Sequence, residues 1–141
     1  MYSTKLTVSI HILCVVGLNK QPAVTSDTIA SSIQTNPALV RRLMGGLKAA
    51  GLVKTQTKLG VTGLGRPANQ ISMLDIFKAV EKEQHLFNIH ANTNERCPVG
   101  ANIERVMGRI RDTIQADFEK ELDSVPLSDI LDSIQESGEM C

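Results

Sequence analysis

The chain has 141 residues, of which 42% are hydrophobic, so it can bury the core of one domain. Only 3% are aromatic, which argues against a β-sandwich core and against recognition of single-stranded nucleic acid by stacking. Its formal net charge is zero, yet residues 1–74 carry eight basic and one acidic residue (+7), and residues 75–141 carry seven basic and 14 acidic residues (−7). The positive half favours a polyanionic partner, and charge alone leaves nucleic acid and anionic lipid open.

Residues 4–18 are apolar on nearly all sides of a helix, which predicts a buried helix at a subunit contact. The run is too short to cross a membrane. Within it we expect Cys14 to pack in the core and His11 to be hydrogen-bonded rather than a ligand. The three cysteines have no framework spacing, so a reducing cytoplasm is the expected location.

The next two helices form a predicted helix-turn-helix. Residues 26–34 are expected to form the first of these helices, with Ser26 as its N-cap. The other, the third helix of the chain, begins at Pro37 and ends at Gly51. Its apolar residues point inward and leave Arg41, Arg42 and Lys48 outside. In this arrangement the second helix reads a major groove.

A short β-hairpin is expected behind the helix pair. Residues 52–56 alternate between apolar and polar, three glycines punctuate residues 60–65, and residues 68–73 look like a strand again. Ser72 and Asp75 then resemble a capping box that opens another helix. The predicted fold class is mainly α with a small β wing.

The C-terminal part is predicted to hold a long helix. Residues 82–100 form an irregular loop, and beyond it apolar residues recur every three or four positions over five to six turns. Such a seam predicts dimerisation through Ile103, Met107, Ile110, Ile114 and Phe118. We therefore divide the chain into a winged helix-turn-helix domain (1–81), a loop with a sensing role (82–100), and a dimerisation helix with a short final helix and acidic tail (101–141).

Three blocks, "NPALVRRLMGGLKAAGLV", "LGVTGLGRP" and "ISMLDIFKAVE", resemble the Rrf2 family of bacterial transcription regulators. The resemblance implies a dimeric winged-helix repressor or activator that binds a palindromic operator through the helix of residues 37–50. The wing departs from the family pattern, because Val61 and Thr57 stand where glycines are usual. Together with the exposed cations, the resemblance makes the candidate DNA-binding residues Asn36, Ala38, Arg41, Arg42, Lys48, Lys58 and Arg66.

Several members of that family hold an iron–sulfur cluster through three cysteines in the loop before the long helix. Only Cys97 lies in that loop here, so no cofactor and no metal are expected, although His85, His90 and Glu95 with Cys97 are an alternative ligand set. The neighbouring Arg96 and the following helix start are expected to lower the thiol pKa, which makes Cys97 a candidate redox sensor. An inert loop cysteine is the alternative.

We expect a homodimeric, sequence-specific DNA-binding regulator, a repressor that responds to a redox event or a small ligand. An enzyme is not expected, because Cys97 with His85 or His90 lacks an orienting third group and an oxyanion motif. The alternative function is a winged-helix adaptor that binds another protein without binding DNA.

Overall fold

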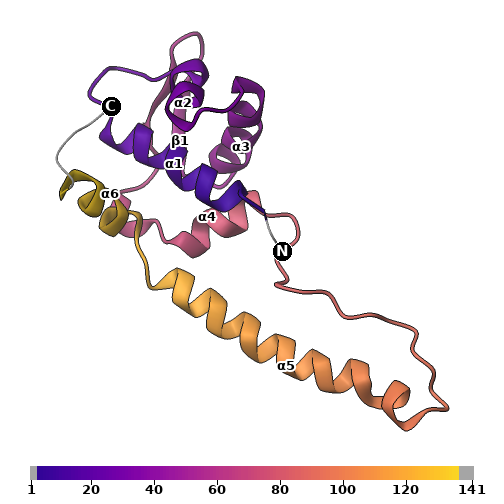
Figure 1. Ribbon diagram of the computed structural model, residues 1–141. Coiled ribbons are helices and arrows are strands. Elements are labelled where there is room, and N and C mark those ends of the chain that lie inside the picture. The colour runs from indigo at the N-terminus through magenta and orange to yellow at the C-terminus, as the bar shows by residue number, and fades with distance from the viewer. Residues whose placement is uncertain (1–2, 137–141) are drawn as a thin grey trace.

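The computed structural model describes residues 3–136 and places a helical body, a two-stranded hairpin and a long projecting helix in one chain (Figure 1). The elements in chain order are α1 (Lys5–Leu18), α2 (Ser26–Ile33), α3 (Pro37–Ala49), β1 (Val53–Gln56), β2 (Gly60–Leu64), the 3-10 turn η1 (Ala68–Gln70), α4 (Met73–Val80), α5 (Pro98–Asp123) and α6 (Leu127–Glu136).

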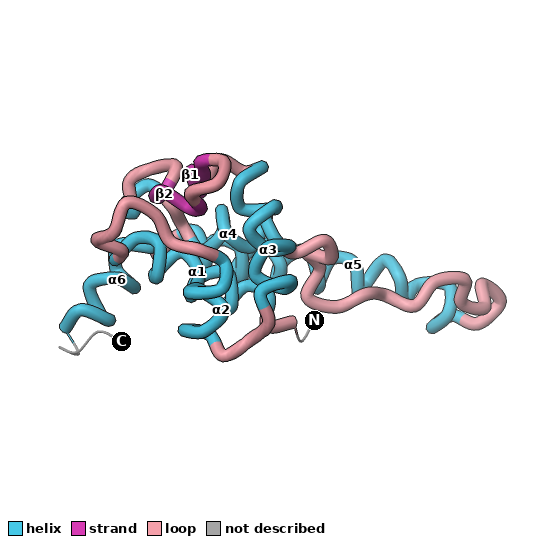
Figure 2. Tube along the Cα trace, turned by 90° about the horizontal axis from the view of Figure 1, so that it is seen from above, coloured by secondary structure: helices cyan, strands magenta, loops and turns pink. Residues whose placement is uncertain are grey.

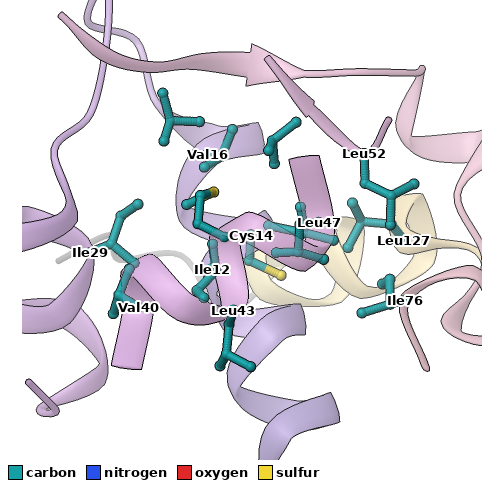
Figure 3. Close-up of a cluster of buried hydrophobic side chains, with 14 of the residues drawn as sticks. Ile12, Cys14, Val16, Ile29, Val40, Leu43, Leu47, Leu52, Ile76 and Leu127 are labelled. Atoms are coloured by element: carbon teal, nitrogen blue, oxygen red, sulfur yellow. The ribbon is translucent and has the colours of Figure 1, made fainter. Parts of the chain in front are cut away.

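Helix α1 lies at the centre of the body and contacts α2, α3, α4, β2 and α6. Its Ile12 and Leu13 are completely buried, and Figure 3 shows Ile12 among side chains from the surrounding elements. The apolar residues on several sides of α1 are therefore covered by the chain itself, so they do not require the subunit contact that we expected. Among residues 3–136, no helix has both the length and the apolar character needed to cross a bilayer.

Local capping explains where the two helices of the helix-turn-helix begin and end. The α2 N-cap is Thr25, whose hydroxyl accepts the Thr28 N–H at 3.2 Å, so the prediction of Ser26 was one residue off. Helix α3 begins at Pro37, as predicted, and Gly51 (φ +76°) ends it. There the Leu52 N–H donates to the Leu47 carbonyl at 2.9 Å, which is the bond expected of a Schellman cap.

The wing is built differently from the prediction. β1 pairs antiparallel with β2, the glycine-bearing segment itself, whereas residues 68–70 form the 3-10 turn η1 and not the predicted strand. A Cβ on Gly60 would lie 2.7 Å from the Val24 carbonyl oxygen. The missing side chain lets β2 approach residue 24, and Val24 and Val61 exchange two hydrogen bonds of 2.9 Å. The wing is thereby fixed to the segment that leads into α2.

Helix α4 connects the body to the C-terminal helices. Ser72 and Asp75 form the predicted capping box at its start. The segment between α5 and α6 returns to this start, where the Leu127 N–H donates to the Ile71 carbonyl at 2.7 Å. Helix α5 has 26 residues and begins at Pro98, three residues before the predicted boundary. Its N-terminal end points away from the body, alongside the loop that precedes it (Figures 1 and 2).

Candidate nucleic-acid interface

The outward face of α3 carries most of the predicted DNA-binding side chains. Val40, Leu43, Met44 and Leu47 are buried on the inner face, whereas Leu39 is half-buried. Because one helical face repeats every three or four residues, the exposed positions fall together on the other side. These exposed residues are Ala38, Arg41, Arg42, Gly45, Lys48 and Ala49.

Arg41 and Arg42 have no acidic partner within the described chain. The ion pairs found among residues 3–136 involve Arg66, Lys78 and Arg111. Arginine presents a fork of N–H donors that suits guanine edges and phosphate oxygens. Unpaired on an exposed face, these two guanidinium groups are therefore available to a polyanion.

Asn36 has a structural role at the start of α3. Its side-chain oxygen accepts the Leu39 N–H at 2.8 Å, so this residue is the helix N-cap. An N-cap satisfies a backbone donor that the helix cannot pair itself. Its side-chain NH2 group is not used in this bond, so it remains available for the predicted DNA contact.

The two predicted wing cations lie in different surroundings. Lys58 is exposed in the turn between the strands, in a left-handed conformation (φ +70°). Arg66 lies at the other end of the hairpin, where its guanidinium is 3.5 Å from the Asp75 carboxylate, the same group that caps α4. Arg66 is thus held at the base of the wing, whereas Lys58 is free to extend from its tip.

Sequence reasoning missed Gly45 and Ala49 as parts of the outward face. Gly45 follows Arg41 by four residues, so helical spacing could have placed it there. A residue without a charged or polar side chain gave no chemical reason to single it out.

A second surface lies on α5. Val99, Val106, Ile110 and Ile114 are large apolar residues that stay exposed, whereas Ile103 and Met107 are half-buried. Phe118, also predicted for the dimer contact, packs edge-to-face on Phe77 of α4 with ring centroids 5.6 Å apart. The apolar surface is therefore concentrated on the projecting part of the helix, and its root is attached to the body.

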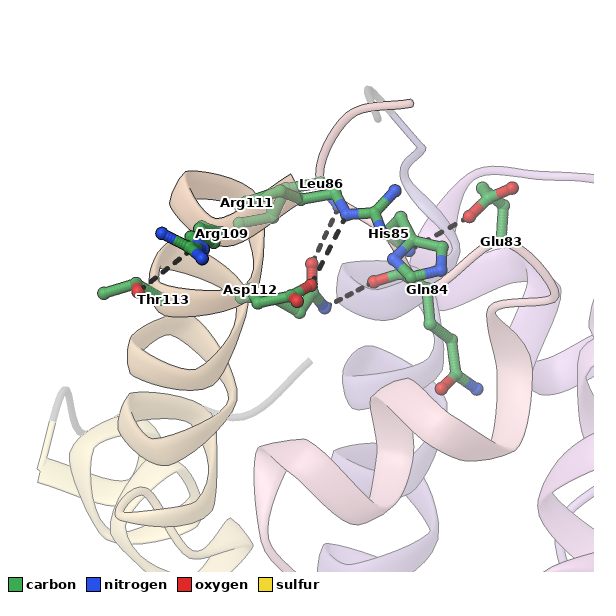
Figure 4. Close-up of polar contacts among 9 residues, drawn as sticks. Glu83, Gln84, His85, Leu86, Arg109, Arg111, Asp112 and Thr113 are labelled. Carbon is green, nitrogen blue, oxygen red and sulfur yellow. Dashed lines mark hydrogen bonds and ion pairs between the residues drawn. The ribbon is translucent and has the colours of Figure 1, made fainter. Parts of the chain in front are cut away.

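The loop before α5 is hydrogen-bonded to that helix. The Gln115 side chain accepts the Leu86 N–H at 2.9 Å and donates to the Gln84 carbonyl at 2.6 Å. Figure 4 labels Gln84 and Leu86, the two loop residues that this side chain joins. At the far end of the loop, the Thr93 hydroxyl donates to the Gly100 carbonyl. The loop is therefore attached to α5 at two places, near Gln115 and at the start of the helix.

Cys97 lies exposed at the N-cap of α5. The backbone N–H groups of Gly100 and then Val99 hold the pKa of its thiol below the ordinary value. The helix start, one of the two predicted causes, accounts for this shift. Burial acts in the opposite direction on Cys14, whose pKa it raises to about 11.

The side chains that could ligate a metal ion are not grouped together in the described part of the chain. Within residues 3–136, no three His, Cys, Asp or Glu side chains are grouped so that they could hold a metal ion, and this includes His85, His90, Glu95 and Cys97. Cys141 lies outside the described residues. His11 is hydrogen-bonded in the way we expected, with its Nε2 2.9 Å from the Ser32 hydroxyl.

A helix-turn-helix with a basic outward face, followed by a β-hairpin, defines the chain as a winged-helix protein of the DNA-binding class. The Rrf2 family model, described as "Iron-dependent Transcriptional regulator", matches residues 2–133. The chain therefore belongs to the Rrf2 family, whose members are transcriptional regulators and not enzymes. The described side chains include no grouped set of His, Cys, Asp or Glu that would suit the iron named in that description.

Individual relatives agree with this assignment. The "Putative HTH-type transcriptional regulator YwnA" of Bacillus subtilis (strain 168) is 33% identical over 134 residues, which cover 95% of this chain and 99% of the relative. A crystal structure of a "putative DNA binding protein" has 30% identity and a TM-score of 0.73, covering 90% of this chain and 98% of the other. CymR, the global cysteine regulator of B. subtilis, shares the fold with 22% identity and a TM-score of 0.66, covering 94% and 96%.

Proposed function

We propose that the protein is a homodimer that binds a palindromic operator through α3 and represses transcription from it. The observation that carries this proposal is the outward face of α3, where Arg41 and Arg42 are exposed and have no carboxylate partner in the described chain. An exposed basic helix that is second in a helix-turn-helix suits the major groove.

The exposed apolar residues of α5 support the homodimer. Ile110 and Ile114 are each 44% exposed and Val106 is 40% exposed, on a helix that projects from the body. Burial of apolar surface against a second copy would remove it from water. A dimer with a two-fold axis at this contact presents two symmetry-related copies of α3. A palindromic operator has two half-sites with the same symmetry.

The position of Cys97 supports a response to oxidants or electrophiles. This thiol is exposed and its pKa is lowered, and Cys97 occupies the N-cap position of the helix proposed to join the two subunits. Modification there would alter the start of α5 and thereby the distance between the two α3 helices. Half-sites lie about 34 Å apart on one face of DNA, so a small change in this distance weakens binding.

Selection from genomic DNA fragments, including the region upstream of the protein's own gene, tests the proposal. We expect the purified protein to retain fragments with two related half-sites, to protect both in footprinting, and to lower expression of a reporter placed downstream. Retention only at low salt, with no footprint, would contradict the proposal. A protein partner captured without any DNA would favour the adaptor function instead.

A further inference from the structure

Two adjacent glycines, Gly45 and Gly46, lie in the interior of α3. Glycine is less favourable than alanine inside a helix, because its backbone loses more freedom on folding. The fold explains Gly46: a Cβ there would lie 2.7 Å from the carbonyl oxygen of Ala79, so the missing side chain allows α3 to pack closely on α4.

The fold gives no such explanation for Gly45. A Cβ at this position would meet no atom within 4 Å, and the residue is exposed. Its backbone is helical and it is not among the glycines with positive φ. Alanine would therefore fit without strain and would favour the helix.

Gly45 lies in the middle of the outward face of α3. It follows Arg41 by four residues and Arg42 by three, and it precedes Lys48 by three, so cations surround it on the helix surface. Ala38 and Ala49, the other exposed residues of this face, are also small. A face with long basic side chains around a centre without side chains fits a groove whose edges carry phosphates.

We propose that Gly45 is a DNA-contacting residue of this regulator, kept without a side chain so that the backbone of α3 can lie directly against the groove. This inference rests on the proposed function. A methyl group at position 45 would then separate the helix from DNA and shorten the reach of the neighbouring cations. Stability and DNA affinity would change in opposite directions.

The test compares Gly45→Ala and Gly45→Leu with the natural protein, using thermal unfolding and the Kd for the selected operator. We expect an equal or higher Tm for Gly45→Ala, together with about tenfold weaker binding, the size of one disrupted base contact. Gly45→Leu should bind more weakly still.

Two other glycines serve as controls. A Cβ on Gly108 in α5 would also meet no atom within 4 Å. Gly108 is two residues away from both Val106 and Ile110, so it lies on the opposite side of the helix from them. Gly108→Ala should keep the operator Kd unchanged while Tm stays equal or rises. Gly46→Ala should lower Tm, because its Cβ meets the backbone of α4.

The outcomes separate this inference from the proposed function. If both Gly45 variants bind the operator as tightly as the natural protein, the inference is wrong and the proposed function stands. A lower Tm for Gly45→Ala also overturns the inference, because the fold would then need the glycine. If the natural protein selects no operator, the proposed function fails and the inference fails with it.

Discussion

The thiol pKa values of Cys14 and Cys97 are shifted in opposite directions because of where each residue lies. Cys14 is packed in the core, where burial raises its pKa to about 11. Cys97 is exposed, and backbone N–H groups at the start of α5 lower its pKa. The thiolate is the nucleophilic form, so Cys97 is the more reactive of the two near neutral pH.

Alkylation of a Cys141→Ser variant tests this difference, since that substitution removes the cysteine outside the described residues. We expect Cys97 to react with iodoacetamide at a lower pH than a free cysteine does, and Cys14 to react only after unfolding. The pKa of Cys97 is lower in the folded protein than in the unfolded chain. The thiolate therefore stabilises the folded protein above the unfolded pKa, and this stabilisation is lost as pH falls through the folded pKa. Equal rates at the two sites in the folded protein would contradict this.

Single-residue predictions from sequence succeeded where the chemistry was local. Pro37 at a helix start, Gly51 at a helix end and the Ser72–Asp75 capping box are all present in the structure. The α2 N-cap could not be decided in this way, because Thr25 and Ser26 both carry a suitable hydroxyl group.

At the scale of elements, α5 has one part attached to the body and one part free. Its root is joined to α4 through the Phe77–Phe118 contact and through Lys78 and Glu119, whose charged groups are 3.9 Å apart. Further along, Ile110 and Ile114 are exposed. This division leads us to expect that the proposed dimer depends on the free part, and that the fold does not.

Ile110→Asp combined with Ile114→Asp should therefore abolish the dimer and leave the helix content intact. Charged side chains at these positions would have to be buried in the contact, which is unfavourable without a partner charge. Light scattering after size-exclusion chromatography gives the mass, and circular dichroism gives the helix content. Ala116→Asp, at an exposed position on another side of α5, is the matched control and should remain dimeric. A dimeric Ile110/Ile114 variant would rule out this surface.

The loop before α5 should depend on Gln115 for its position. Replacement by alanine removes both hydrogen bonds to residues 84 and 86, so we expect faster amide hydrogen exchange across residues 84–88. Gln70→Ala, an exposed substitution in η1, is the control and should leave exchange in this segment unchanged. Unchanged exchange in the Gln115 variant would show that other contacts hold the loop.

Elements were predictable from periodicity and caps, whereas their partners were not. The helical spacing of α3 indicated which of its residues face outward. The second strand of the wing was misplaced, because three glycines resemble a turn until the pairing of Val61 with Val24 is known. Phe118 belongs to the apolar spacing of α5, but only the position of α4 shows that it packs within the chain.

At the scale of the whole molecule, the charges are divided between two halves. Residues 1–74, which contain α1 to α3 and the wing, have a net charge of +7, and the remaining residues have −7. DNA would attract the first half and repel the second. The charge asymmetry was visible in the sequence, whereas only the structure shows that Arg41 and Arg42 have no carboxylate partner among the described residues.

The measurement that tests the central claim most directly is operator binding by fluorescence anisotropy at several salt concentrations, for the natural protein and for Arg41→Ala with Arg42→Ala. Arg105→Ala with Arg109→Ala, which removes two exposed arginines from α5, is the matched control. We expect the α3 variant to lose specific binding and to show a shallower salt dependence, because fewer phosphate charges are neutralised, while the control binds normally. Equal loss in both variants, or unchanged binding in the α3 variant, would contradict recognition through α3.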